Sequence, residues 1–299
     1  MFETTKKNKR ESAFIISLFI IVITLIVYYI CYSLDFGPIS IIIALVFSIT
    51  SAWGSYYFSD RIVLSLNNAR PATKEEDLKI VNILDSLMIT SGLTVKPKLY
   101  IIDSTQANAF ATGRNPENSV ICLTKGLLEM LDYYELEGVI AHELSHIKNY
   151  DIRLNCIVSV MVGFVIILSD MFSRMLFRSS SRKNNKDSNG GNGIFMLIGF
   201  ILLILSPIFT TLMKLALSRK REFLADTTAA EFTRNPDGLI SALEKLENDR
   251  NELDSANKTT ASMYIVNPFK KNEKNKKNSD LWSTHPNTQD RIEALRNLK

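Results

Sequence analysis

Cysteine is scarce in this chain, with three among 299 residues, and no two of them are closely spaced. The sequence therefore has neither the paired cysteines of a disulfide framework nor the CxxC spacing of a zinc knuckle. Cys31, Cys122 and Cys156 are expected to act as small apolar residues in a reducing compartment. Histidine is equally scarce, with three in the chain, and there is no internal repeat.

Charge is absent from four long windows, residues 13–34, 36–59, 154–169 and 188–213. The 35 Lys and Arg and the 31 Asp and Glu all lie in the remainder, about 31% of which is charged. A single soluble core does not separate its charges in this way, which excludes a purely soluble protein. The charged remainder equally excludes a protein that is wholly buried in a membrane.

The first two windows are each long enough to cross a bilayer as a helix. Basic residues precede the first window, as in a signal peptide, but its apolar run is too long and no small-x-small cleavage site follows. We expect a retained membrane anchor over residues 1–60, with spans at about 13–34 and 38–58.

The last two windows predict a membrane hairpin over residues 154–213, with spans at about 154–173 and 194–213 and a polar linker between them. The third window is short, so the pair forms either two full crossings, which we favour, or a re-entrant hairpin. Lys and Arg before the first span and after the fourth place both ends of the chain in the cytoplasm. The basic residues of the linker oppose this orientation.

The charged segments predict several helices and a small sheet. A helix begins at Thr73, which has the Thr-x-x-Glu capping pattern, and stops near Gly92. Strand-like runs at 98–103, 108–112 and 119–123 favour a small antiparallel β-meander. Further helices are expected over 132–150, 214–233, 239–253 and 288–298. The Lys- and Asn-rich run 270–279 is typical of a solvated loop beside a membrane and not of a nucleic-acid-binding segment.

The helix over 132–150 contains the sequence HELSH, which places His142 and His146 on one face. Two imidazoles at this spacing can bind one Zn²⁺, and Glu143 lies beside them as a candidate general base. The surrounding apolar residues keep the spacing of a helix. A chance match is rare in a chain with three histidines, so a metal site is preferred to two surface histidines on an amphipathic helix.

A catalytic zinc site needs a third protein ligand. One class of zinc proteases has it six residues after the second histidine, where this chain has Ile152, and the only other histidine is His285. Glu222 is the better candidate, with Asp226 one turn further on, placed to accept the free N–H of a ligand histidine. The alternative for this pair is an exposed acidic helix face. Two crossings or a re-entrant hairpin return Glu222 to the side of His146, whereas one or three crossings would separate them.

With two N-terminal spans, HExxH, a membrane hairpin and ExxxD in this order, the chain resembles the HtpX family of membrane zinc metalloproteases, relatives of the CaaX prenyl proteases. Other matching pieces are residues 108–113 (NAFATG), Ala141, Asn149, Asp151, residues 283–286 (STHP) and Arg291. The CaaX prenyl proteases have more spans than this chain can supply, so the HtpX branch fits better.

The resemblance implies a mainly α-helical integral membrane protein of about four spans with a zincin-like α+β domain. Its cytoplasmic halves would be residues 61–153 and 214–299. It implies one Zn²⁺ per chain, bound by His142, His146 and Glu222, with Glu143 as general base and then acid. The implied substrates are polypeptides, namely misfolded or damaged membrane proteins, cleaved at the cytoplasmic face of the cell membrane.

The resemblance also suggests that one strand offers an edge on which substrate backbone can pair, at Asn108, Ala109, Phe110 and Ala111. His285 either donates to the oxyanion or shapes the helix start at Pro286, and the sequence leaves both open. The oligomeric state is not indicated.

Two other classes of protein were weighed. In a site-2-type intramembrane protease, Asp237 in the NPDG sequence would supply the third ligand, but the many charges around HExxH are unsuited to lipid. A catalytically inactive zinc-binding adaptor is disfavoured because Glu143 and all three ligand candidates are present.

Overall fold

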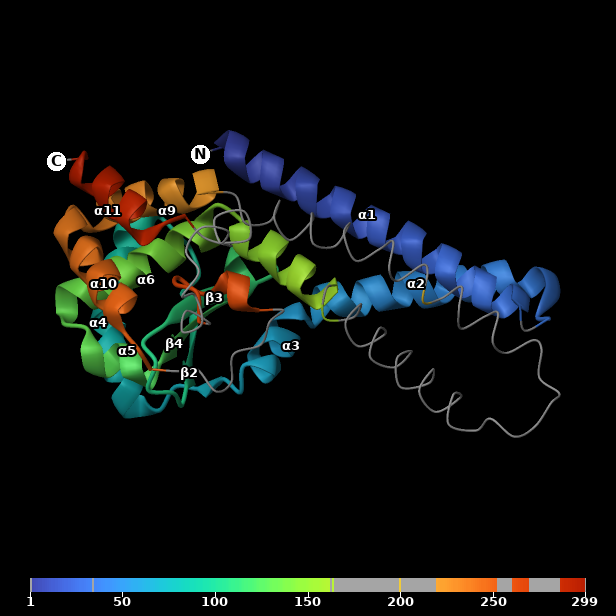
Figure 1. The fold of residues 1–299 in the computed structure, drawn as a ribbon, viewed down its shortest axis with the longest axis horizontal. Helices are drawn as coiled ribbons and strands as arrows, with labels where there is room; N and C mark the ends of the chain where they lie inside the picture. The colour runs from blue at the N-terminus through green and yellow to red at the C-terminus, as the bar shows by residue number, and fades with distance from the viewer. Residues whose placement is uncertain are drawn as a thin grey trace.

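A computed structural model describes residues 2–33, 35–161, 163, 199, 219–251, 260–268 and 286–298. Figure 1 shows two long helices, α1 and α2, projecting as a hairpin from a globular part that contains the other labelled elements. The elements in chain order are α1 (Phe2–Ser33), η1 (Gly37–Ile39), α2 (Ser40–Tyr57), α3 (Ser59–Leu66), β1 (Arg70–Pro71), α4 (Lys74–Ser91), β2 (Lys98–Ile102), β3 (Ala109–Gly113), η2 (Pro116–Asn118), β4 (Ser119–Thr124), α5 (Lys125–Met130), α6 (Tyr133–Lys148), α9 (Arg219–Thr233), α10 (Pro236–Asn248), η3 (Ala261–Met263) and α11 (Thr288–Arg296).

The hairpin has the length and the surface of a membrane anchor. Two segments, Thr5–Tyr29 and Gly37–Tyr57, are long and apolar enough to cross a bilayer. Large apolar side chains on the hairpin are exposed, among them Phe14 at 64% and Ile42 at 60%. A soluble protein would bury such faces, whereas lipid covers them in a membrane. The two helices cover most of the first two predicted spans, 13–34 and 38–58, but α1 begins earlier, within the basic segment, and α2 runs from Ser40 to Tyr57.

The predicted second membrane hairpin falls mostly outside the described residues. Residues 151–161 form a helix that continues from the α6 region, and they include the start of the third predicted span. The rest of that span, the linker and the fourth predicted span lie outside, apart from residues 163 and 199. The run 270–279 also lies outside.

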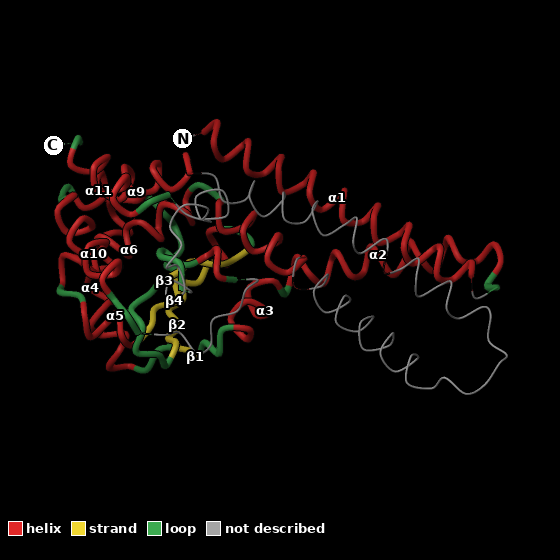
Figure 2. The backbone as a smooth tube through the Cα atoms, viewed as in Figure 1, coloured by secondary structure: helices red, strands yellow, loops and turns green. Residues whose placement is uncertain are grey.

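The sheet is mixed, so the prediction of an antiparallel β-meander was wrong. Its strand order is β1-β2-β4-β3, with β2 parallel to β4, β3 antiparallel to β4 and the two-residue β1 added at one edge. The strand β4 lies between β2 and β3 because both of its faces are covered by protein. Ile121 and Leu123 face the cluster formed with α4 and α6, and Val120 and Cys122 face α3 and residues 151–161. Figure 2 shows the strands, in yellow, inside the globular part.

Local signals set most helix ends as predicted. The capping box of Thr73 and Glu76 starts α4, and Gly92 ends it at a φ of 67°. A second capping box, of Asp132 and Glu135, starts α6. The helix expected at 239–253 instead begins at Pro236, because proline has a suitable φ and lacks only an N–H that the first helical turn leaves unbonded.

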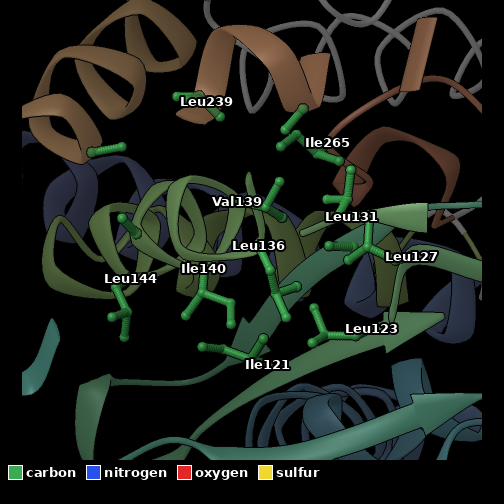
Figure 3. Packing of buried hydrophobic residues seen from close by; sticks show 14 of the residues in the cluster. Ile121, Leu123, Leu127, Leu131, Leu136, Val139, Ile140, Leu144, Leu239 and Ile265 are labelled. Atoms are coloured by element: carbon green, nitrogen blue, oxygen red, sulfur yellow. The ribbon is translucent and has the colours of Figure 1, made fainter. Parts of the chain in front are cut away.

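The helix α6 lies in the centre of the core. Its apolar side chains Leu136, Val139, Ile140 and Leu144 lie between the sheet residues Ile121 and Leu123 and, on the other side, Leu239 of α10 (Figure 3). Burial on all sides holds this helix rigidly, which suits it to carry a precisely placed site.

Gly138 permits the close approach of α6 and α10, and Gly138→Ala is expected to lower the free energy of unfolding by about 1–3 kcal/mol. A Cβ there would lie 2.7 Å from the backbone nitrogen of Leu239 and 2.9 Å from its Cα. Gly54→Ala in α2 is the control, because its Cβ would have nothing within 4 Å. Thermal unfolding in detergent measures both. An equal midpoint for Gly138→Ala and wild type would contradict the prediction.

Candidate metal centre

Three candidate ligands from two helices meet on one side of α6. His142 and His146 lie one turn apart on α6, and Glu222 lies in the first turn of α9, which packs against α6. The Nε2 atoms of the two histidines are 3.2 Å apart. The Glu222 carboxylate oxygens lie 3.6 Å from Nε2 of His142 and 3.5 Å from Nε2 of His146. The three residues form a possible metal site, with one donor atom from each within 4.8 Å of the others.

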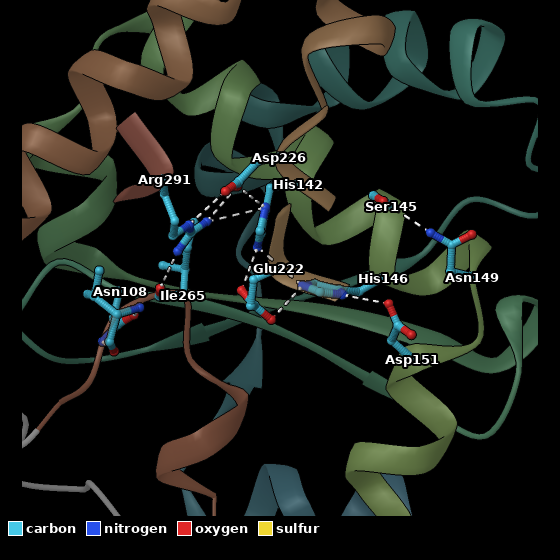
Figure 4. A network of polar contacts seen from close by, with 11 residues as sticks. Asn108, His142, Ser145, His146, Asn149, Asp151, Glu222, Asp226, Ile265 and Arg291 are labelled. Carbon is cyan, nitrogen blue, oxygen red and sulfur yellow. Dashed lines mark hydrogen bonds and ion pairs between the residues drawn. The ribbon is translucent and has the colours of Figure 1, made fainter. Parts of the chain in front are cut away.

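A separate carboxylate orients each histidine. Asp226 Oδ1 lies 2.9 Å from Nδ1 of His142, and Asp151 Oδ2 lies 2.9 Å from Nδ1 of His146 (Figure 4). An ionised carboxylate can only accept hydrogen bonds, so both Nδ1 atoms carry the proton. Nε2 of each ring is then the nitrogen left to bind a metal once its own proton is displaced, and both Nε2 atoms face the Glu222 carboxylate.

Arg291 of α11 in turn holds the carboxylate of Asp226. Its guanidinium donates to both oxygens of Asp226, at 2.8 and 2.7 Å, and to the backbone oxygen of Ile265 at 3.0 Å. The side chains of Arg291 and Asp226 are only 1% and 2% exposed. Burial raises the pKa of Asp226, but the charge and hydrogen bonds of Arg291 outweigh it and hold that pKa below its usual value.

Sequence reasoning had assigned no role to Asp151 or Arg291. Asp151 lies five residues after His146, and its signals were this closeness in the chain to HExxH and its place among the residues that carry the family resemblance. Arg291 lies 65 residues after Asp226 in the chain, so only the fold brings their side chains together.

The donor set fits a zinc ion. Three groups that can donate a lone pair to a metal, two imidazole nitrogens and a carboxylate, converge within 4.8 Å of one another. Tetrahedral Zn²⁺ with Zn–N bonds near 2.0–2.1 Å would hold two imidazole nitrogens about 3.3 Å apart, close to the observed separation. Three protein ligands also leave a fourth position open, as in catalytic zinc sites.

The carboxylates around the two histidines favour the binding of a cation at this site. Burial lowers the pKa of both imidazoles, but the carboxylates outweigh it. Asp226 and Glu222 raise the pKa of His142, and Glu222 and Asp151 raise the pKa of His146 to about 9. A metal ion entering this site must displace protons, so metal affinity will fall as the pH is lowered.

Glu143 lies beside the ligand cluster and is not part of it. Its side chain is buried, and burial raises the pKa of its carboxyl, while the two histidines and a hydrogen bond from the Ala111 backbone N–H lower it in part. Glu143, both histidines, Glu222 and Ala111 line one cavity of about 10 Å³, room for roughly one water molecule. A carboxyl in such a position can exchange a proton with a molecule in the cavity.

The strand β3 is an edge strand whose outer side faces this site. Asn108 pairs with Thr124 of the neighbouring strand segment, so the backbone groups of Ala109 and Ala111 point to the outer edge. The Ala109 oxygen already accepts from the Ile265 N–H at 2.9 Å. All four predicted edge residues are buried, and Ala111 is the one among them that lines the cavity.

Two further candidates from the sequence are His285 and Asp237. His285 is outside the described residues, so its two possible roles stay predictions. Asp237, the ligand that a site-2-type protease would use, is exposed in the first turn of α10 and does not belong to the cluster.

Comparisons with known proteins show which proteins this chain resembles over its length. The family model "Peptidase family M48" matches residues 74–299. A "Protease HtpX homolog" of Dictyoglomus turgidum is 43% identical, with 99% of this chain and 94% of that protein covered. Another, of Caldanaerobacter subterraneus, is 38% identical, with 100% and 98% covered. A crystal structure of S. mikatae Ste24p covers 99% of this chain and 67% of that one, with a TM-score of 0.50 and 20% identity, which shows a shared fold.

Proposed function

Because this chain belongs to peptidase family M48 and is a metalloprotease of the HtpX type, we propose that it binds one catalytic Zn²⁺ through His142, His146 and Glu222. The observation that carries the proposal is the convergence of these three donors, with each histidine oriented by its own buried carboxylate. Asp226 and Asp151 are then the groups that hold the two imidazoles in the ligating tautomer.

Glu143 is the proposed general base and then the general acid. Zn²⁺ in this site would polarise the scissile carbonyl and lower the pKa of water to about 7. Glu143 takes a proton from the attacking water and delivers it to the nitrogen of the leaving amine. A buried carboxyl whose pKa is raised can both accept and return a proton near neutral pH.

The proposed substrate is an extended polypeptide that pairs with the outer edge of β3. Backbone pairing on a strand edge reads few side chains, so it suits an enzyme that cleaves unfolded membrane proteins of varied sequence. Ala111 and Glu143 line the same cavity, so pairing of substrate with the Ala111 backbone oxygen would place the scissile bond beside Glu143. Pairing of substrate at Ala109 is less available, because the backbone oxygen of Ala109 already accepts a hydrogen bond from the Ile265 N–H.

The active site is proposed to face the cytoplasm, close to the surface of the cell membrane. Asn8, near the start of α1, donates to Asp151, which orients His146, and this contact supports a placement of the metal centre on the same side of the bilayer as the start of α1. The basic residues at this end of α1, Lys6, Lys7, Lys9 and Arg10, favour the cytoplasmic side. Quality control of damaged membrane proteins is the process that this placement suits.

Removal and return of zinc tests the proposal. Protein purified in detergent under chelation should cleave an unfolded membrane protein at no more than the background rate, because its candidate ligands then hold no Zn²⁺. Cleavage should return when about one Zn²⁺ per chain has been added, with zinc content measured by mass spectrometry.

Two outcomes would contradict the proposal of a zinc-dependent protease. Cleavage that persists in protein shown to hold no zinc would exclude a zinc mechanism. Wild-type protein that binds one zinc per chain but cleaves no substrate would favour the inactive adaptor.

A further inference from the structure

The start of the first membrane helix reaches the candidate metal centre through Asp151, the carboxylate that orients His146. Asn8 precedes the apolar part of α1 and is only 1% exposed. Its Nδ2 donates to Asp151 Oδ1 at 2.6 Å and to the backbone oxygen of Asn149 at 2.9 Å. The other oxygen of Asp151 lies 2.9 Å from Nδ1 of His146. Two side chains, Asn8 and Asp151, therefore connect α1 to the candidate ligand His146.

Asn8 bonds to both sides of the turn that follows α6, at Asn149 and at Asp151. A side-chain amide nitrogen carries two hydrogens, and here each has its own acceptor. Asn149 caps the C-terminus of α6, and the next residue, Tyr150, has a φ of 62°. Such a φ is costly for a bulky residue and needs support from its surroundings. Lys9 adds to that support, with its Nζ 4.1 Å from the centre of the Tyr150 ring.

The same end of α1 also reaches the helix that carries Glu222. Glu11 Oε2 lies 3.6 Å from Nη2 of Arg221, the residue that precedes Glu222. Further along α1, Ile15 and Phe19 pack in one cluster with Leu154 and Ile157 of the helix 151–161. The contact of Asn8 is therefore part of a larger interface.

We propose that Asn8 is a positioning residue for the metal centre. It fixes the Asp151 carboxylate, and through that carboxylate the ring orientation and the Nδ1 proton of His146. The first membrane helix is thus a structural part of the metal site as well as an anchor. The inference rests on the proposed function, since it takes His146 to be a zinc ligand.

The expected loss of zinc affinity follows from how Asn8 reaches His146 through Asp151. Without the amide, Asp151 keeps its bond to His146 but loses the donor that holds its other oxygen, so the carboxylate can rotate and the imidazole is less well fixed. Losing a group that orients a metal ligand commonly weakens metal binding by about 10–100-fold. Asn8 acts one step further out, so the lower end of that range, about tenfold, is expected.

The test measures zinc affinity, by competition with a chelator, for the full chain in detergent. Asn8→Leu replaces the amide with an apolar side chain of similar size and should weaken zinc binding about tenfold. Asn8→Ala, a smaller change, is measured in parallel in case Asn8→Leu does not fold. Ser12→Ala is the matched control, because Ser12 is equally buried on α1 but donates only to the Asn8 backbone oxygen. It should bind zinc as wild type does.

A double-mutant cycle separates positioning from a general loss of structure. In an Asp151→Ala background, Asn8→Leu should have little further effect on zinc affinity, because Asn8 acts through Asp151. Additive losses would overturn the inference. So would Asn8 variants that bind zinc as tightly as Ser12→Ala. If the wild type binds no zinc, the proposed function fails instead.

Discussion

Glu143→Gln is expected to reduce the rate of peptide cleavage by about 10²–10⁴-fold and to leave zinc binding unchanged. Glutamine has nearly the same shape as glutamate, but its amide cannot take a proton from water or return one to an amine. Glu143 is not in the ligand cluster, so the three donors stay in place. Cleavage of an unfolded membrane protein and zinc content are measured on the same preparation.

Glu137→Gln is the matched control for Glu143→Gln. It removes a carboxyl from the same helix, and Glu137 is half-buried but does not line the cavity. Its cleavage rate should equal that of the wild type. A Glu143→Gln protein that cleaves within about tenfold of wild type would contradict the proposed base, since that loss is below the range for proton transfer. A Glu143→Gln protein that loses its zinc would place Glu143 among the ligands instead.

Arg291→Met is expected to lower the free energy of unfolding by about 3 kcal/mol, the low end of the cost of breaking a buried ion pair, because Asp226 loses the guanidinium but keeps its contact with His142. Both side chains are nearly inaccessible, and two hydrogen bonds join them. For a domain of this size the unfolding midpoint should fall by roughly 10 °C. Thermal unfolding is measured in detergent under chelation, so that any loss of bound zinc does not contribute.

Arg296→Met supplies the control on the same helix. Arg296 pairs with Glu244 at 2.9 Å, but both side chains are exposed, at 62% and 47%. A surface pair of this kind contributes about 1 kcal/mol or less. Adding Asp226→Asn to Arg291→Met should recover part of the lost stability, because no unpaired charge then remains. Equal midpoints for Arg291→Met and Arg296→Met would contradict the buried-pair argument.

The sequence by itself determined the local parts of the centre. A helical repeat places His142 and His146 on one face whatever the rest of the fold does, and the capping box of Asp132 and Glu135 starts that helix. The uncharged windows likewise predict the α1–α2 hairpin, because a bilayer requires a minimum apolar length. These features depend on residues a few positions apart, so periodicity and capping reveal them.

The tertiary structure decided which distant groups complete the centre. The sequence favoured Glu222 and Asp226, but only the packing of α9 on α6 brings them to the histidines. Asn8 and Arg291 come from opposite ends of the chain, and no local pattern distinguishes them from other polar residues. The order of the strands was likewise decided by which strand has both faces covered. Contacts of this kind depend on how whole elements pack, and a pattern within one segment does not contain that information.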